Sequence, residues 1–105
     1  MTVPPFYFEY HSNWFNLFTE LVRQLRMKIR LFIKPYCPWC HKAQSWLDER
    51  GINYETLDVI GDSKAFAEMV KLSGQELAPV IDVDGKILAD FGPEELAKFW
   101  ESLKR

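Results

Sequence analysis

The sequence predicts a single α/β domain preceded by one extra helix, in the order helix and then β-α-β-α-β-β-α. Short apolar runs of strand length alternate with longer segments whose apolar residues recur at helical spacing. The last two strand-like runs are separated only by Asp84-Gly85, the strongest hairpin signal in the chain. Both cysteines, Cys37 and Cys40, lie where the first strand-like run passes into a helical pattern.

The strands are predicted from their apolar content and from the turn residues beside them. The first run is short, apolar and followed by Pro35, which is typical of a buried strand. Gly61-Asp62-Ser63 interrupts the chain after the second run, and Ala78-Pro79 leads into the third. The predicted strands are Lys28–Ile33, Asn53–Val59, Val80–Val83 and Lys86–Ala89.

Glycines and capping residues bound the three helices that follow the strands. Gly51 ends the first helix, Trp39–Arg50, and Gly74 ends the second, which Asp62 or Ser63 caps. The last helix begins at Gly92-Pro93-Glu94-Glu95. The residues predicted to face inward are Cys40, Ala43 and Leu47; Phe66, Met69, Val70 and Leu72; and Leu96, Phe99, Trp100 and Leu103.

Residues 1–26 form an N-terminal extension with a predicted amphipathic helix that Ser12 can cap. Its apolar stripe runs from Trp14 to Leu25 at helical spacing. The preferred interpretation is that this stripe packs on the domain or on a second copy. Contact with a membrane surface is the second choice, because aromatic residues are dense and basic residues follow. Met27 is itself a natural start for the rest of the chain, residues 27–105, which is a third interpretation.

Composition narrows the class of protein. The chain has 105 residues, of which 48% are hydrophobic and 27% charged, enough for one globular core. A net charge of −2 gives no reason to expect a nucleic-acid partner. No apolar stretch approaches the roughly 20 residues of a transmembrane helix, and no signal peptide is recognisable. Two cysteines are too few for a disulfide scaffold, so a reducing, cytoplasmic location is expected.

The C-x-x-C motif at a strand-to-helix junction indicates redox chemistry. Free amides and the positive dipole end of a helix favour a thiolate over a thiol. Pro38 suits the first helical position, where its missing N–H is not needed. Cys37 then lies at the exposed helix entrance, Cys40 lies one turn inside, and Lys34 adds positive charge. Cys37 is therefore interpreted as the nucleophile and Cys40 as the resolving thiol.

Two metal interpretations of the motif are weaker. A structural zinc site needs four ligands, and His11 and His41 are the only histidines that could join the two cysteines. The C-x-x-C-H pattern also matches covalent haem attachment, but no export signal is recognisable and a small α/β domain offers no haem pocket. No metal site is predicted. His41 is expected on the helix surface, with a lesser possibility that it tunes Cys40.

The segment Lys34 to Cys40, K-P-Y-C-P-W-C, resembles the active site of dithiol glutaredoxins, which usually have C-P-Y-C after a Lys. The resemblance runs from about Met27 to Leu103 and implies a thioredoxin fold, with a four-stranded mixed sheet flanked by helices. It also implies that Ala78–Pro79 is cis, because Leu77-Ala78-Pro79 stands where glutaredoxins usually have Thr-Val-Pro. Some glutaredoxins hold a 2Fe–2S cluster between two subunits, although those with Pro after the first cysteine tend not to.

The same resemblance implies a set of residues that bind glutathione or a substrate. Lys34 and Tyr36 would hold the glycine carboxylate, and the backbone of Ala78 would pair with the cysteine of glutathione. The full set is Lys34, Tyr36, Trp39, Ala78, Pro79, Asp90 and Phe91. At the γ-glutamyl end the sequence departs from the family, because Asp90-Phe91-Gly92-Pro93 replaces a Gly-Gly pair. This stretch looks more like the Phe-x-Pro-Asp segment of the donors to ribonucleotide reductase, which take electrons from thioredoxin reductase.

The expected function is that of a thiol–disulfide oxidoreductase acting on protein disulfides or glutathione mixed disulfides. Glutathione is expected as its reductant, bound weakly at the γ-glutamyl end, and no tightly bound cofactor is expected. One alternative is an electron donor reduced by thioredoxin reductase. The other is a non-catalytic adaptor that binds a 2Fe–2S cluster.

Overall fold

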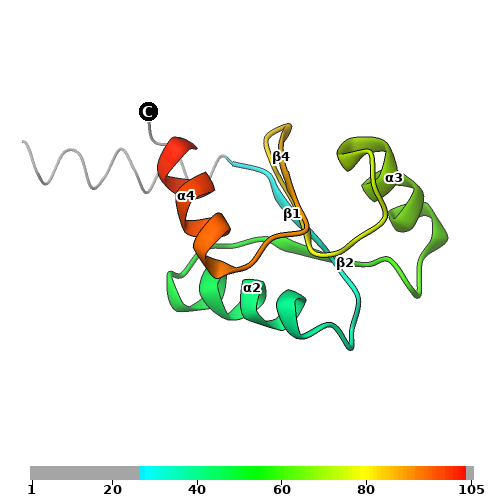
Figure 1. Cartoon of the computed structure of the whole chain (residues 1–105), viewed down its shortest axis with the longest axis horizontal. Coiled ribbons are helices and arrows are strands. Elements are labelled where there is room, and N and C mark those ends of the chain that lie inside the picture. The colour runs from blue at the N-terminus through cyan, green and yellow to red at the C-terminus, as the bar shows by residue number, and fades with distance from the viewer. Residues whose placement is uncertain (1–26, 104–105) are drawn as a thin grey trace, which may run out of the picture.

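The computed structural model describes residues 27–103, which form a four-stranded mixed sheet with helices on both faces (Figure 1). The elements are β1 (Ile29–Ile33), α2 (Pro38–Glu49), β2 (Glu55–Asp58), α3 (Ser63–Ser73), β3 (Val80–Val83), β4 (Lys86–Ala89) and α4 (Pro93–Leu103). The strand order is β2-β1-β3-β4. β1 runs parallel to β2, whereas the β1–β3 and β3–β4 pairs are antiparallel. The predicted fold class is confirmed.

The two faces of the sheet bury two separate cores. Alternate side chains of a strand point to opposite faces, so Leu31 and Phe32 enter different cores. Helices α2 and α4 cover the larger core, where Cys40, Leu47 and Leu96 are fully buried. Helix α3 covers the smaller core on the other face, as the separation of the helices in Figure 1 shows.

The local signals in the sequence account for most element boundaries. Asp62 caps α3, because its Oδ1 accepts hydrogen bonds from the amides of Lys64 and Ala65 at 2.9 and 3.3 Å. Gly74 ends α3 in the left-handed conformation with φ of 71°. Differences are small: α2 begins at Pro38 and ends at Glu49, one residue earlier than expected at each end, and β2 is shorter than predicted. The predicted helix after Ser12 lies outside the described residues.

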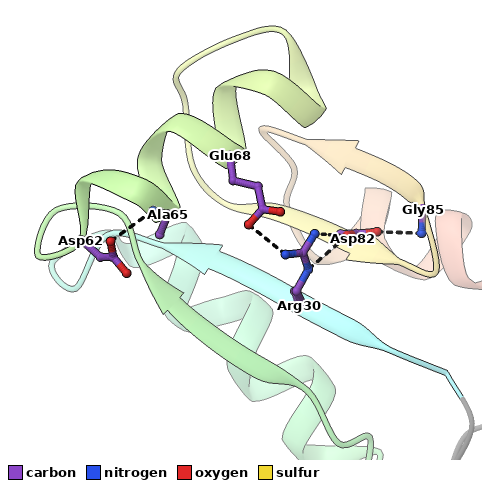
Figure 2. Close-up of polar contacts among 6 residues, drawn as sticks. All are labelled: Arg30, Asp62, Ala65, Glu68, Asp82 and Gly85. Atoms are coloured by element: carbon purple, nitrogen blue, oxygen red, sulfur yellow. Dashed lines mark hydrogen bonds and ion pairs between the residues drawn. The ribbon is translucent and has the colours of Figure 1, made fainter.

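An ionic cluster that the sequence interpretation missed lies between α3 and the sheet (Figure 2). Arg30 donates to Asp82 Oδ2 from Nε at 3.2 Å and from Nη2 at 2.7 Å, and its Nη1 lies 2.9 Å from Glu68 Oε1. Asp82 is buried, and its Oδ1 accepts from the amide of Gly85 in the hairpin turn at 2.8 Å. One guanidinium thus connects β1, β3 and α3.

Within residues 27–103, no helix is long and apolar enough to cross a bilayer. The membrane interpretation of the N-terminal extension concerns residues outside this range.

Candidate active site

The topology gathers the predicted site residues at one end of the sheet. The end of β1 pairs with the start of β3 through Phe32 and Val80, and Val80 pairs in turn with Ala89 at the end of β4. Three connections therefore meet there: the loop from β1 to α2, the segment before β3 and the segment after β4. Together with the first turn of α2 they carry every residue of the predicted site.

Cys37 is the N-cap of α2, the position predicted for a nucleophile. Its Sγ accepts a hydrogen bond from the amide of Cys40 at 3.3 Å, so an orphan donor of the first helical turn points at this sulfur. Pro38 occupies the start of the helix. The amide of Cys37 donates to the carbonyl of Lys34 at 3.0 Å, which closes the preceding turn. Cys37 is half-buried and is a free thiol.

Cys40 lies one turn further along α2, where it is fully buried. Burial raises the pKa of this thiol to about 12, and its hydrogen bond to the side chain of Cys37 acts in the same direction. The backbone and charge of Lys34 act in the opposite direction. The two cysteines therefore differ in access, because Cys37 is half-buried whereas Cys40 is closed off from solvent.

His41 lies on the surface of α2, as expected, and makes a contact that the sequence did not indicate. Its Nε2 lies 2.6 Å from the carbonyl oxygen of Pro35. A carbonyl oxygen can only accept, so Nε2 carries the proton in this hydrogen bond. This hydrogen bond links the loop before Cys37 to the first turn of α2.

The segment before β3 contains the expected cis peptide bond, Ala78–Pro79. Gln75 braces this segment, a role that sequence reasoning missed. The Oε1 of Gln75 accepts from the amide of Leu77 at 2.6 Å, and its Nε2 donates to the carbonyl of Leu77 at 3.0 Å. Nε2 also donates to Ser73 Oγ at 2.9 Å. The side-chain amide of Gln75 therefore hydrogen-bonds to both the N–H and the C=O of Leu77, the residue before Ala78.

Large apolar side chains are exposed around the cysteines. Tyr36, Trp39 and Leu77 are 73%, 52% and 54% exposed, and Ile60 in the turn after β2 is 54% exposed. By contrast, Phe91 and Pro79, which were predicted to bind substrate, are almost completely buried.

The segment after β4 contains a residue with positive φ and the capping bond of α4. Asp90 adopts the left-handed conformation with φ of 52°, and its amide donates to the carbonyl of Pro79 at 2.8 Å. Glu95 was not singled out from the sequence, yet its Oε1 accepts from the amide of Gly92 at 2.9 Å. This is the return bond of a capping box, for which the Gly-x-x-Glu spacing is a recognisable signal. Hydrogen bonds to its own amide and to that of Gly92 lower the pKa of Glu95.

Within residues 27–103, no three His, Cys, Asp or Glu side chains are grouped so that they could bind a metal ion.

A mixed sheet of this topology with a C-x-x-C at the start of its first helix defines a dithiol protein of the thioredoxin fold. Residues 29–88 match the family model described as Glutaredoxin. This chain belongs to the glutaredoxin family and is a glutaredoxin-like disulfide oxidoreductase.

Relatives and solved structures agree with this assignment. The chain is 37% identical over 73 residues to a glutaredoxin-like 8.6 kDa protein of the rubredoxin operon of Clostridium pasteurianum, covering 70% of this chain and 97% of that protein. It is 31% identical over 58 residues to glutaredoxin 3 of Escherichia coli, covering 55% and 70% respectively. The thioredoxin-like protein BC3987 superposes with a TM-score of 0.63 at 28% identity, covering 68% of this chain and 97% of that structure.

Proposed function

We propose that this protein reduces protein disulfides and glutathione mixed disulfides by dithiol exchange, with Cys37 as nucleophile and Cys40 as resolving thiol. The observation that supports this assignment is the unequal placement of the two sulfurs. Cys37 caps α2 and accepts a backbone hydrogen bond, whereas Cys40 is fully buried behind it. A helix N-terminus stabilises the anionic form of a sulfur that it faces.

The reaction proceeds in two displacements. The thiolate of Cys37 attacks one sulfur of the substrate disulfide, a bond forms between them, and the other substrate sulfur leaves as a thiolate that takes a proton from water. The thiol of Cys40 then loses its proton, and its sulfur attacks Cys37 Sγ. This step forms the Cys37–Cys40 disulfide and releases the second substrate sulfur, which is protonated in turn. The substrate gains two electrons and the protein loses two.

Single-cysteine variants test these roles. Cys37→Ser is expected to abolish reduction of both substrate classes, measured by coupled turnover with protein disulfides and with glutathione mixed disulfides. Cys40→Ser is expected to lose protein-disulfide reduction and to retain reduction of glutathione mixed disulfides, which needs only one thiol. Activity that survives Cys37→Ser but not Cys40→Ser would reverse the assignment.

We further propose that glutathione returns the protein to its dithiol form, with Lys34 and Tyr36 beside Cys37 contributing most of its binding. The γ-glutamyl end contributes little, because Glu95 already occupies the amide of Gly92 and Asp90 repels a carboxylate. A coupled assay separates the two reductants. Turnover with glutathione and glutathione reductase supports the proposal, and turnover only with thioredoxin reductase contradicts it.

The domain boundary at residue 27 is part of the same proposal. Every residue assigned a role lies in the segment 27–105, so deletion of residues 1–26 is expected to leave turnover largely intact. Its effect is expected on solubility or oligomeric state, measured by size-exclusion chromatography with light scattering. Flotation of the full-length and shortened chains with liposomes tests the membrane interpretation separately.

A further inference from the structure

A cavity of about 310 Å³ lies beside the candidate nucleophile. It is lined by Trp39, Asp90, Phe91, Gly92 and Glu95, which come from the first turn of α2 and from the junction of β4 with α4. The indole of Trp39 closes one side so tightly that a Cβ on Gly92 would lie 3.0 Å from its ring. Trp39 is two residues from Cys37 in the sequence, so a molecule that reacts with Cys37 has this cavity within reach.

The cavity presents negative charge and few hydrogen-bond donors. Two carboxylates line it, and Glu95 is held ionised by the backbone amides that lower its pKa. The amide of Gly92 is already bonded to Glu95, and Pro93 has no N–H to offer. An anion placed here would therefore meet two like charges, and two of the backbone donors that usually bind anions at a helix start are already bonded or missing.

Two cations lie near the cavity and do not line it. Lys42 places Nζ 4.3 Å from the centroid of the Trp39 ring, on the side of α2 where it lines a different cavity with His41. The charge of Lys98 also lowers the pKa of Glu95, and it is the weakest cause of that shift. Carboxylates therefore dominate the lining.

We propose that this cavity is a substrate subsite for a lysine or arginine side chain of a disulfide-bearing protein. This inference rests on the proposed function and specifies the substrate class. An ammonium or guanidinium group is matched by carboxylate acceptors and by an aromatic wall. The exposed side chains of Tyr36 and Leu77 at the same end of the sheet offer apolar contacts to the residues that flank that cation in the substrate polypeptide. The preferred partner is thus a basic, partly apolar polypeptide segment that carries the reacting cysteine.

The test compares three peptides that each contain one intramolecular disulfide and differ only beside one cysteine, where they carry Lys, Gln or Glu. Each peptide is reduced by the full-length dithiol protein under single-turnover conditions, and the product is separated after an acid quench. Each rate is divided by that for reduction by dithiothreitol, which removes the intrinsic reactivity of the peptide. Since an exposed ion pair contributes up to about 1 kcal/mol, two carboxylates should favour the Lys over the Glu peptide roughly tenfold.

The double variant Asp90→Asn/Glu95→Gln removes both charges and preserves the local structure. Asn tolerates the left-handed conformation of residue 90, and Gln at residue 95 can still accept from the amide of Gly92. The matched control is Glu55→Gln/Glu101→Gln, which changes net charge equally at two exposed positions outside the cavity. The preference for Lys should fall to about twofold or less in the first double variant and persist in the second.

Each outcome decides between the hypotheses. Equal normalised rates for the three peptides with the unmodified protein refute the subsite and leave the proposed function intact. The subsite is also refuted if the preference for Lys survives Asp90→Asn/Glu95→Gln or falls equally in the control variant. In either case the preference comes from the overall electrostatic field of the protein. Failure to reduce any of the three peptides refutes the proposed function and, with it, this inference.

Discussion

Replacing Gln75 by Ala tests how far the segment before Ala78 must be held in place for the reaction. The substitution removes three hydrogen bonds, two to the backbone of Leu77 and one to Ser73 Oγ, with lengths between 2.6 and 3.0 Å. A net value of about 0.5–1 kcal/mol for each partly exposed bond gives a loss of roughly 1.5–3 kcal/mol. Part of that loss is recovered when water bonds the freed groups, so the fall in unfolding free energy should be about 1–2 kcal/mol.

The larger expected effect is on substrate binding. Ala78 follows the braced residue directly, and its backbone is the group expected to pair with the substrate. A segment that samples other conformations must be ordered during binding, so KM for a peptide disulfide should rise about 5- to 30-fold, equivalent to 1–2 kcal/mol. The value of kcat should change little, because the positions of Cys37 and Cys40 do not depend on Gln75.

Steady-state kinetics and denaturant unfolding measure the two effects on the same samples. Gln75→Glu is the matched variant, since it keeps an acceptor for the amide of Leu77 and loses the donor to its carbonyl. It should give an intermediate KM. An unchanged KM in Gln75→Ala, at a measurable loss of stability, would show that bracing serves folding alone.

Three further predictions concern stability and shape. Arg30→Met should lower the unfolding free energy, measured by urea titration, by about 3–5 kcal/mol, because it leaves the buried carboxylate of Asp82 without its cation. The double variant Arg30→Met/Asp82→Leu should recover much of the lost stability. The dithiol form should lose stability as pH rises from about 9 to about 12. In the folded protein the pKa values of both Cys40 and Tyr54 are raised to about 12, from ordinary values of 9.0 and 10.0, so unfolding releases protons in this range. Tyr54→Phe should weaken this pH dependence in melting curves. Gly92→Ala should displace the indole beside it, since the new methyl group would lie 3.0 Å from the ring, and should shift tryptophan fluorescence without unfolding the domain.

The features predicted correctly from sequence are those that depend on neighbours in the chain. Asp84-Gly85 forms the hairpin turn with positive φ at both residues, and Asp62 caps α3 within three residues of its partners. The C-x-x-C motif is equally local, because one helical turn relates Cys37 to Cys40. Such signals need no knowledge of the tertiary structure.

The features missed depend on contacts between distant segments. Arg30 and Asp82 are 52 residues apart, and their strands read as apolar runs in which the charges looked incidental. Their pairing follows from the β1–β3 register, which places them directly opposite one another. The contact between Trp39 and Gly92 likewise requires α2 and α4 to share a face of the sheet. Glu95 is different, since its capping-box spacing was present in the sequence and could have been recognised.

In the proposed reaction, Cys40 is activated by the step that attaches a substrate sulfur to Cys37. In the dithiol form burial raises the pKa of Cys40 to about 12, so this thiol is protonated at pH 7. Burial is the largest cause, and the hydrogen bond and the charge interaction with the side chain of Cys37 act in the same direction. Once Cys37 forms a mixed disulfide it carries no charge, so these two contributions vanish while the opposing influence of Lys34 remains. Cys40 therefore ionises more readily when a substrate sulfur is attached to Cys37, which favours attack on the mixed disulfide over premature reaction of the free dithiol.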